Sequence, residues 1–290
     1  MSIVPEKLFY GEHSQQYFLF YKNPKVNKAA PLILFFHGGG FKKGNPENFP
    51  QELLNTAIKN EFHFVSATYR FLQHESLKSD YIDDGIACLD KLVNIADSHQ
   101  IDLNQMITAG NSAGAHISAP LAFENNHPDV SIIGTILENT QPIPNQISEV
   151  VDSLCPPLDT KDVITAFSPF LTVLNQQILE EFWFKLPLNR DDFENDECFK
   201  FALQEKLKET SIYHLADRSQ IPIVFYSEAP DNLEALLYEN NAPKYVELHS
   251  PILMQVLYQK LKKNSQTTYW VNDYANALLY IFFRTPASIS

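Results

Sequence analysis

The sequence is short of positive charge. It carries 35 Asp and Glu residues but only 22 Lys and Arg, so its formal net charge is −13 at pH 7. Nucleic acids and anionic membrane surfaces are bound through basic patches. The composition therefore disfavours both classes of partner.

Cysteine is also scarce. The sequence contains Cys88, Cys155 and Cys198, whose spacing is not that of a metal site and whose odd number argues against a disulfide framework. We therefore expect no metal, no cofactor and a reducing compartment.

Long apolar runs are absent. The first residues include Glu6 and Lys7 without the apolar stretch of a signal peptide, and no window reaches the length of a membrane span. A cytoplasmic location is the default expectation, although a protein exported without a cleaved signal shares these features. The 290 residues, 44% of them hydrophobic, suffice for one large domain with a sizeable core.

Glycine is uncommon too, with nine residues, and two motifs contain most of them. A short strand-forming run leads into Gly110-Asn111-Ser112-Ala113-Gly114, a G-x-S-x-G signature followed by an Ala-rich segment compatible with a helix. This signature is typical of a nucleophile elbow, in which Ser112 occupies a strained turn between a strand and a helix. Gly110 and Gly114 allow the strand and the helix to approach closely. The helix N-terminus places partial positive charge beside the serine hydroxyl.

The second motif, His37-Gly38-Gly39-Gly40, lies upstream and follows an unbroken apolar run. Such a run indicates a strand buried on both faces, with the glycines in a loop at its carboxyl end. An H-G-G-G loop donates backbone hydrogen bonds to an oxyanion in lipases and esterases. Phosphate binding is the alternative, but neither a following Lys-Ser/Thr nor a G-x-G-x-x-G spacing is present.

The rest of the chain alternates between strand and helix patterns. Strands are predicted over 7–10, 16–21, 31–36, 62–70, 105–109, 131–137, 221–226 and 267–271, and helices over 51–60, 81–98, 250–263 and 273–284. The first two strands should form an antiparallel pair at the sheet edge, and Ile86 should lie on the buried face of its helix. The order predicts an α/β fold with one mostly parallel sheet and helices on both faces. Active residues should cluster at the carboxyl ends of its strands.

The alternation stops near residue 140. Residues 141–220 are Pro-rich and then aromatic and acidic, and they are far more numerous than a crossover between two strands needs. We expect a single domain over residues 1–290, in which 141–220 form a helical cap over Ser112. Its apolar wall would include Phe167, Phe170, Trp183 and Phe184. An ordinary surface excursion is the alternative.

Together these pieces resemble the α/β-hydrolase family, in particular its hormone-sensitive-lipase and bacterial carboxylesterase branch. The matching residues are His37–Phe41, Gly44, Ala67–Arg70, Asp84 and Gly110–His116. The resemblance implies Ser112 as the nucleophile and the backbone amides of Gly39, Gly40 and Ala113 as the oxyanion hole. It also implies that His37 braces the glycine loop. Arg70, Asp84 and His116 are expected to be structural polar or packing residues.

The acid and the base of a catalytic triad are not both found where the resemblance places them. After the strand over 221–226, Asp231 fits the acid best, with Glu228 as the second choice. The histidine should follow the strand over 267–271, but residues 272–276 contain none and no histidine follows His249. His249 is the late candidate for the base, and a surface residue at the start of a helix is the alternative.

Three functions of different classes remain open. The first is a serine hydrolase that cleaves a small carboxylic ester through Ser112 and the H-G-G-G oxyanion hole, with a formamidase-type amidase as a variant. The second is a catalytically impaired protein of the same fold that binds an apolar ligand. The plant gibberellin receptors resemble this branch and keep the pocket while losing the histidine. A relative that binds a partner protein would instead have a filled or closed pocket.

Overall fold

A computed structural model describes residues 3–71, 78–124, 127–140, 194, 198, 212–229 and 251–284. Its strands are β1 (Glu6–Phe9), β2 (Tyr17–Tyr21), β3 (Ala30–Phe36), β4 (His63–Ala67), β5 (Ile101–Asn111), β6 (Ile132–Glu138), β7 (Ile223–Tyr226) and β8 (Thr268–Val271). Its α-helices are α1 (Gln51–Lys59), α2 (Lys78–His99), α3 (Ala115–Phe123), α7 (Ile212–Leu215), α9 (Pro251–Lys263) and α10 (Tyr274–Arg284).

The strands form one sheet of eight, in the order β1-β2-β4-β3-β5-β6-β7-β8. The pairs β1–β2 and β2–β4 are antiparallel, and the pairs from β4 to β8 are parallel. The predicted antiparallel pair at the edge and the mostly parallel sheet are therefore both confirmed. The strand that carries the elbow, β5, lies in the centre between β3 and β6, and parallel strands bring its carboxyl end beside theirs.

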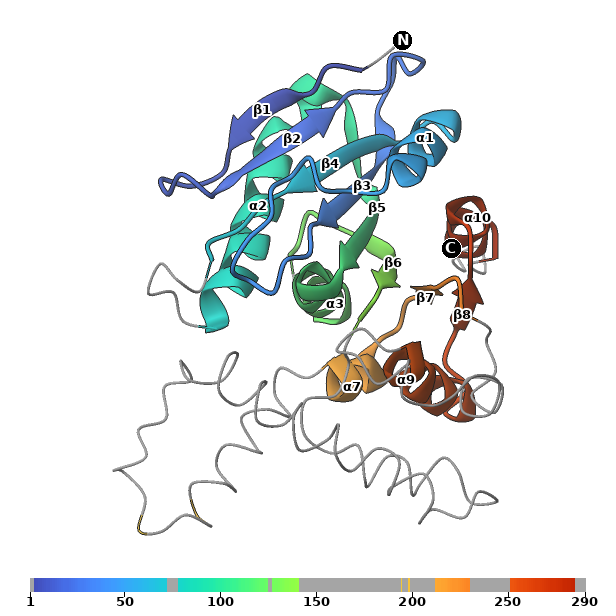
Figure 1. The fold of residues 1–290 in the computed structure, drawn as a ribbon. Coiled ribbons are helices and arrows are strands. Elements are labelled where there is room, and N and C mark those ends of the chain that lie inside the picture. The colour runs from blue at the N-terminus through green and yellow to red at the C-terminus, as the bar shows by residue number, and fades with distance from the viewer. Residues whose placement is uncertain are drawn as a thin grey trace, which may run out of the picture.

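Both faces of the sheet are covered by helices (Figure 1). Along β3, Leu32, Leu34 and Phe36 belong to a core cluster that includes residues of α2, α3 and α9, whereas Ile33 and Phe35 belong to a cluster with residues of α1 and α10. These five side chains are at most 1% exposed. Because successive side chains of a strand point to opposite faces, a strand covered on both sides requires an unbroken apolar run.

One packing prediction is wrong and one lies outside the described residues. Ile86, predicted on the buried face of α2, is 46% exposed. It lines an apolar groove against Pro120 and Leu121 of α3, so the apolar stripe of α2 extends beyond the core that it covers. The predicted cap lies almost entirely outside the described residues. Within the described ranges, no helix has the length and apolarity needed to cross a membrane.

Candidate active site

Ser112 lies in a tight turn at the end of the central strand. β5 ends at Asn111, Ser112 takes a φ of 50°, and one 3₁₀ turn over Ser112–Gly114 leads into α3. This φ falls in the left-handed region, which costs a residue with a side chain free energy and concentrates at functional sites. The expected elbow geometry is therefore present at Ser112.

The two glycines of the signature make this turn sterically possible. A Cβ on Gly110 would lie 2.4 Å from the carbonyl carbon of Gly114, and a Cβ on Gly114 would lie 2.0 Å from the carbonyl oxygen of Phe36. Both contacts are to backbone atoms, which cannot rotate away. The elbow therefore packs against its own strand and against the end of β3.

The glycine loop follows β3 and passes beside Ser112. Gly39, Gly40 and Gly44 have φ values of 126°, 62° and 118°, all in the region that favours glycine. A Cβ on Gly38 would lie 3.3 Å from Ser112 Cβ. The loop is closed by the amides of Lys42 and Lys43, which donate hydrogen bonds to the Gly39 carbonyl oxygen at 3.1 and 3.2 Å.

His37 is held by contacts that suit a bracing role. Its Nδ1 lies 2.7 Å from the Gly38 carbonyl oxygen and its Nε2 lies 2.9 Å from Thr68 Oγ1. Since a carbonyl oxygen only accepts, Nδ1 carries the proton. The ring stacks on Tyr69 with 4.7 Å between centroids, and the Tyr69 hydroxyl donates to the His37 carbonyl oxygen at 2.9 Å. Burial lowers the pKa of His37, which keeps the ring neutral.

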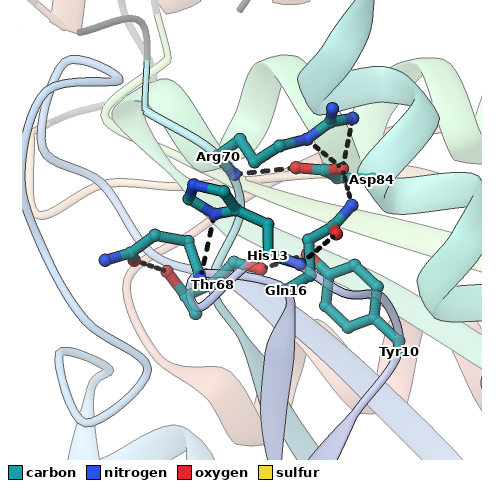
Figure 2. Close-up of polar contacts among 7 residues, drawn as sticks. Tyr10, His13, Gln16, Thr68, Arg70 and Asp84 are labelled. Atoms are coloured by element: carbon teal, nitrogen blue, oxygen red, sulfur yellow. Dashed lines mark hydrogen bonds and ion pairs between the residues drawn. The ribbon is translucent and has the colours of Figure 1, made fainter. Parts of the chain in front are cut away.

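A second polar group fixes the loop that follows β4. The buried Asp84 carboxylate accepts hydrogen bonds from Arg70 Nε at 2.9 Å, from the Arg70 backbone amide at 2.7 Å and from Gln16 Nε2 at 2.7 Å. Figure 2 shows Arg70 and Gln16 converging on Asp84, with the Tyr10 ring and Thr68 beside them. The Tyr10 hydroxyl donates to the Thr68 carbonyl oxygen at 2.5 Å. The predicted role of Arg70 and Asp84 as structural polar partners agrees with these contacts.

Ser112 and the glycine loop line one pocket of about 920 Å³. Its wall is mixed in character and consists of Phe35, Gly38, Gly39, Gly40, Lys43, Gly44, Asn45, Glu47, Asn48, Phe49, Pro50, Asn111, Ser112, Ala113 and His116. All three residues predicted to supply oxyanion amides, Gly39, Gly40 and Ala113, are in this set. A volume of this size suits a small organic ligand.

The predicted triad partners of Ser112 are only partly described. Asp231 and His249 lie outside the described residues, while Glu228 is exposed after the end of β7. In the described chain, the histidine that lines the pocket with Ser112 is His116, whose ring centroid lies 6.2 Å from that of Phe41. The sequence predicts a structural polar or packing role for His116, and its contact with the Phe41 ring agrees with packing.

Tyr274 is the first residue of α10, shortly after β8 ends at Val271, and lies in the segment where the fold's histidine would be expected. Its hydroxyl donates to Glu138 Oε2 at 3.2 Å, and its ring stacks on Tyr226 with 4.1 Å between centroids. Burial, together with the nearby Glu138 charge, raises the pKa of Tyr274 well above its usual value, so the phenol stays protonated and donates. Asp273, the residue before it, accepts a hydrogen bond from the Asn276 amide at 2.7 Å and so caps α10.

Comparisons with known proteins identify the family and support the fold. The BD-FAE family model matches residues 19–181. The chain is similar to the probable carboxylesterase 6 of Arabidopsis thaliana, with 29% identity over 116 residues that make up 37% of this chain and 34% of that protein. Among solved structures, esterase 2 of Thermogutta terrifontis gives a TM-score of 0.59 at 17% identity, covering 98% of this chain and 95% of that chain. Esterase B of Lactobacillus rhamnosis, inhibited by a tributyrin phosphonate, gives a TM-score of 0.57 at 15% identity, covering 92% and 74%.

The matches differ in how much of each protein they cover. The matched segments span 31–35% of the curated relatives' own length. The structural neighbours, at 15% and 17% identity, show a shared fold. Because the family model covers more than half of the sequence, this protein belongs to the BD-FAE family of α/β-hydrolase esterases.

Proposed function

We propose that this protein is a serine carboxylesterase in which Ser112 is the nucleophile. The observation that carries the proposal is the strained Ser112, whose Cβ faces Gly38 in a pocket that the glycine loop also lines. A serine on an elbow beside a glycine loop is the arrangement that acyl transfer requires.

In the proposed reaction, Ser112 Oγ attacks the ester carbonyl carbon and transfers its proton to a base. The carbonyl oxygen becomes an oxyanion that accepts hydrogen bonds from the amides of Gly39, Gly40 and Ala113. The C–O bond to the alcohol then breaks, and the alcohol leaves with the proton returned by the base. Water hydrolyses the acyl-enzyme by the same steps and releases the acid.

The base in this proposal is His249, oriented by Asp231. A serine without a base is a poor nucleophile. His116 competes for the role because it lines the pocket with Ser112. The two are separated by comparing His249→Ala with His116→Ala, since only loss of the base removes most of the turnover while the protein stays folded.

We propose small esters of short acids as substrates. The pocket of about 920 Å³ has a mixed lining, and esterase B is inhibited by a tributyrin phosphonate. p-Nitrophenyl acetate and butyrate are therefore the first substrates to test, with an N-formyl anilide as the test of the amidase variant.

The decisive experiment is labelling by a fluorophosphonate probe. The wild-type protein should be labelled and should hydrolyse p-nitrophenyl butyrate, and Ser112→Ala should do neither while keeping its thermal midpoint. Ser118→Ala, a change at a buried serine of α3, is the matched control and should be labelled like the wild type. Labelling that survives in Ser112→Ala refutes the assignment.

Binding without turnover is the second candidate function. It is favoured by Tyr274 at the start of α10, because a protonated phenol occupies the segment where the fold's histidine would lie. In that case the wild type binds a short-chain ester without consuming it, and Ser112→Ala binds it with the same affinity.

A further inference from the structure

A row of polar side chains runs along the carboxyl edge of the sheet beside the elbow. The strand register places Asn111, the last residue of β5, opposite Glu138, the last residue of β6. Glu138 in turn lies opposite Tyr226, the last residue of β7. The hydroxyl of Tyr274, which follows β8 in the chain, donates a hydrogen bond to the Glu138 carboxylate.

Asn111 connects this row to the glycine loop. Its side chain donates a hydrogen bond to the Glu138 carboxylate. Its Oδ1 lies 2.7 Å from the point where a Cβ on Gly38 would be, and that same point is 3.3 Å from Ser112 Cβ. Asn111 therefore spans the gap between Glu138 and the first glycine of the loop, directly beside Ser112.

The charge state of Glu138 decides whether this connection holds. Burial raises the pKa of Glu138, and the like charge of Glu228 raises it further, whereas the hydrogen bonds from Asn111 and Tyr274 lower it. The other acidic groups at this edge, Glu52 of α1 and Asp273 before α10, act on the neighbouring Tyr226. An ionised carboxylate accepts from both donors, but a protonated one has to donate at one of its oxygens.

We propose that Glu138 is a positioning residue, whose carboxylate orients the Asn111 side chain and, through it, holds Gly38 against Ser112. This inference rests on the proposed esterase function. Acylation of Ser112 then becomes faster as Glu138 ionises, because only the ionised carboxylate accepts from both Asn111 and Tyr274 and so fixes the Asn111 side chain beside Gly38.

The test compares Glu138→Gln with two neighbouring variants of the full chain, using p-nitrophenyl butyrate hydrolysis and fluorophosphonate labelling across pH. Glu138→Gln should lower kcat by roughly tenfold to a hundredfold, the range expected when a catalytic group is slightly misplaced, with little change in KM. The step in the pH profile that follows Glu138 should disappear. Glu228→Gln should move that step to lower pH, because it removes a like charge that raises the pKa of Glu138, and Tyr274→Phe should move it to higher pH, because it removes a hydrogen bond that lowers this pKa.

A readout that does not need turnover keeps this inference separable from the proposed function. The Asn111 side-chain amide signals in a ¹H–¹⁵N spectrum, assigned by their loss in Asn111→Ala, should titrate in the wild type and become independent of pH in Glu138→Gln. A wild type that is labelled, with Glu138→Gln unchanged in rate and pH profile, overturns the positioning role and leaves the esterase function standing. A wild type that is not labelled refutes the esterase function, and the amide titration alone then decides whether Glu138 orients Asn111.

Discussion

Replacing Gly114 by alanine tests the packing on which the elbow depends. The new Cβ would lie 2.0 Å from the Phe36 carbonyl oxygen, 2.5 Å from its carbonyl carbon and 2.8 Å from the His37 carbonyl oxygen. All three are backbone atoms at the end of β3, and Phe36 is paired with Ala67 on one side and Gly110 on the other. No side-chain rotation can relieve the contact.

The size of the expected loss in stability and rate follows from how far the elbow has to move away from the sheet. Cβ atoms essentially never approach a heavy atom within 3.0 Å, so the 2.0 Å contact forces a displacement of at least 1.0 Å between the elbow and the sheet. Overpacking costs about 1–3 kcal/mol where side chains can adjust, so a clash with fixed backbone should cost about 3 kcal/mol or more. A displacement of about 1 Å at a reacting group lowers rates by roughly a hundredfold.

Thermal unfolding followed by circular dichroism measures the stability cost. At about 2 °C per kcal/mol for a chain of this size, Gly114→Ala should melt about 6 °C or more below the wild type. Gly40→Ala is the control, because its Cβ would meet nothing within 4 Å and only its φ of 62° is unfavourable. It should cost about 1–2 kcal/mol. If Gly114→Ala melts with the wild type and is labelled by a fluorophosphonate at the same rate, the close packing of elbow and strand is refuted.

Three further predictions concern the groups that support the site. His37→Ala should cost about 2–4 kcal/mol, because it removes the bonds to Gly38 and Thr68 and leaves a cavity; loss of labelling without loss of thermal stability would instead point to proton transfer. Asp84→Asn should lower the free energy of unfolding by about 2–3 kcal/mol, because it weakens the hydrogen bonds to Arg70 and Gln16. The control, Asp90→Asn at the surface, should lower it by under about 1 kcal/mol. Both are measured by urea unfolding, and equal losses would contradict the structural role of Asp84. Burial lowers the pKa of His63 from 6.5, so its stabilising effect is complete above pH 6.5 and is lost as the pH falls through its folded value. His63→Gln should therefore flatten the dependence of the melting temperature on pH in this range, and an unchanged slope would exclude His63 as its source.

The sequence predicts the fold well because its signals are local. The apolar run of β3 predicts a strand buried on both faces, and the glycines around Ser112 predict a tightly packed turn. The structure shows both. Ile86 shows the limit of such reasoning, since helical spacing identifies an apolar stripe but not how far the neighbouring helix covers it.

Two residues of the proposed site, Glu138 and Tyr274, could not be predicted from the sequence, because their position depends on strand register and distant contacts rather than on any local pattern. Glu138 looks like the ordinary end of a buried strand, and nothing in its neighbours indicates that β5 and β7 end at the same level. Tyr274 is likewise recognisable only by its contact with a residue far away in the sequence. The predicted acid and base, Asp231 and His249, remain predictions.

The central place of β5 has a consequence for how this site unfolds. Thr108 and Gly110 pair with β3 on one side and β6 on the other, so their amides lie in the most enclosed part of the sheet. Such positions exchange their hydrogens with solvent only when the whole domain opens. We therefore expect the end of β5 that leads into Ser112 to unfold only together with the whole domain. Motion that admits a ligand is expected in the loops that follow the strands.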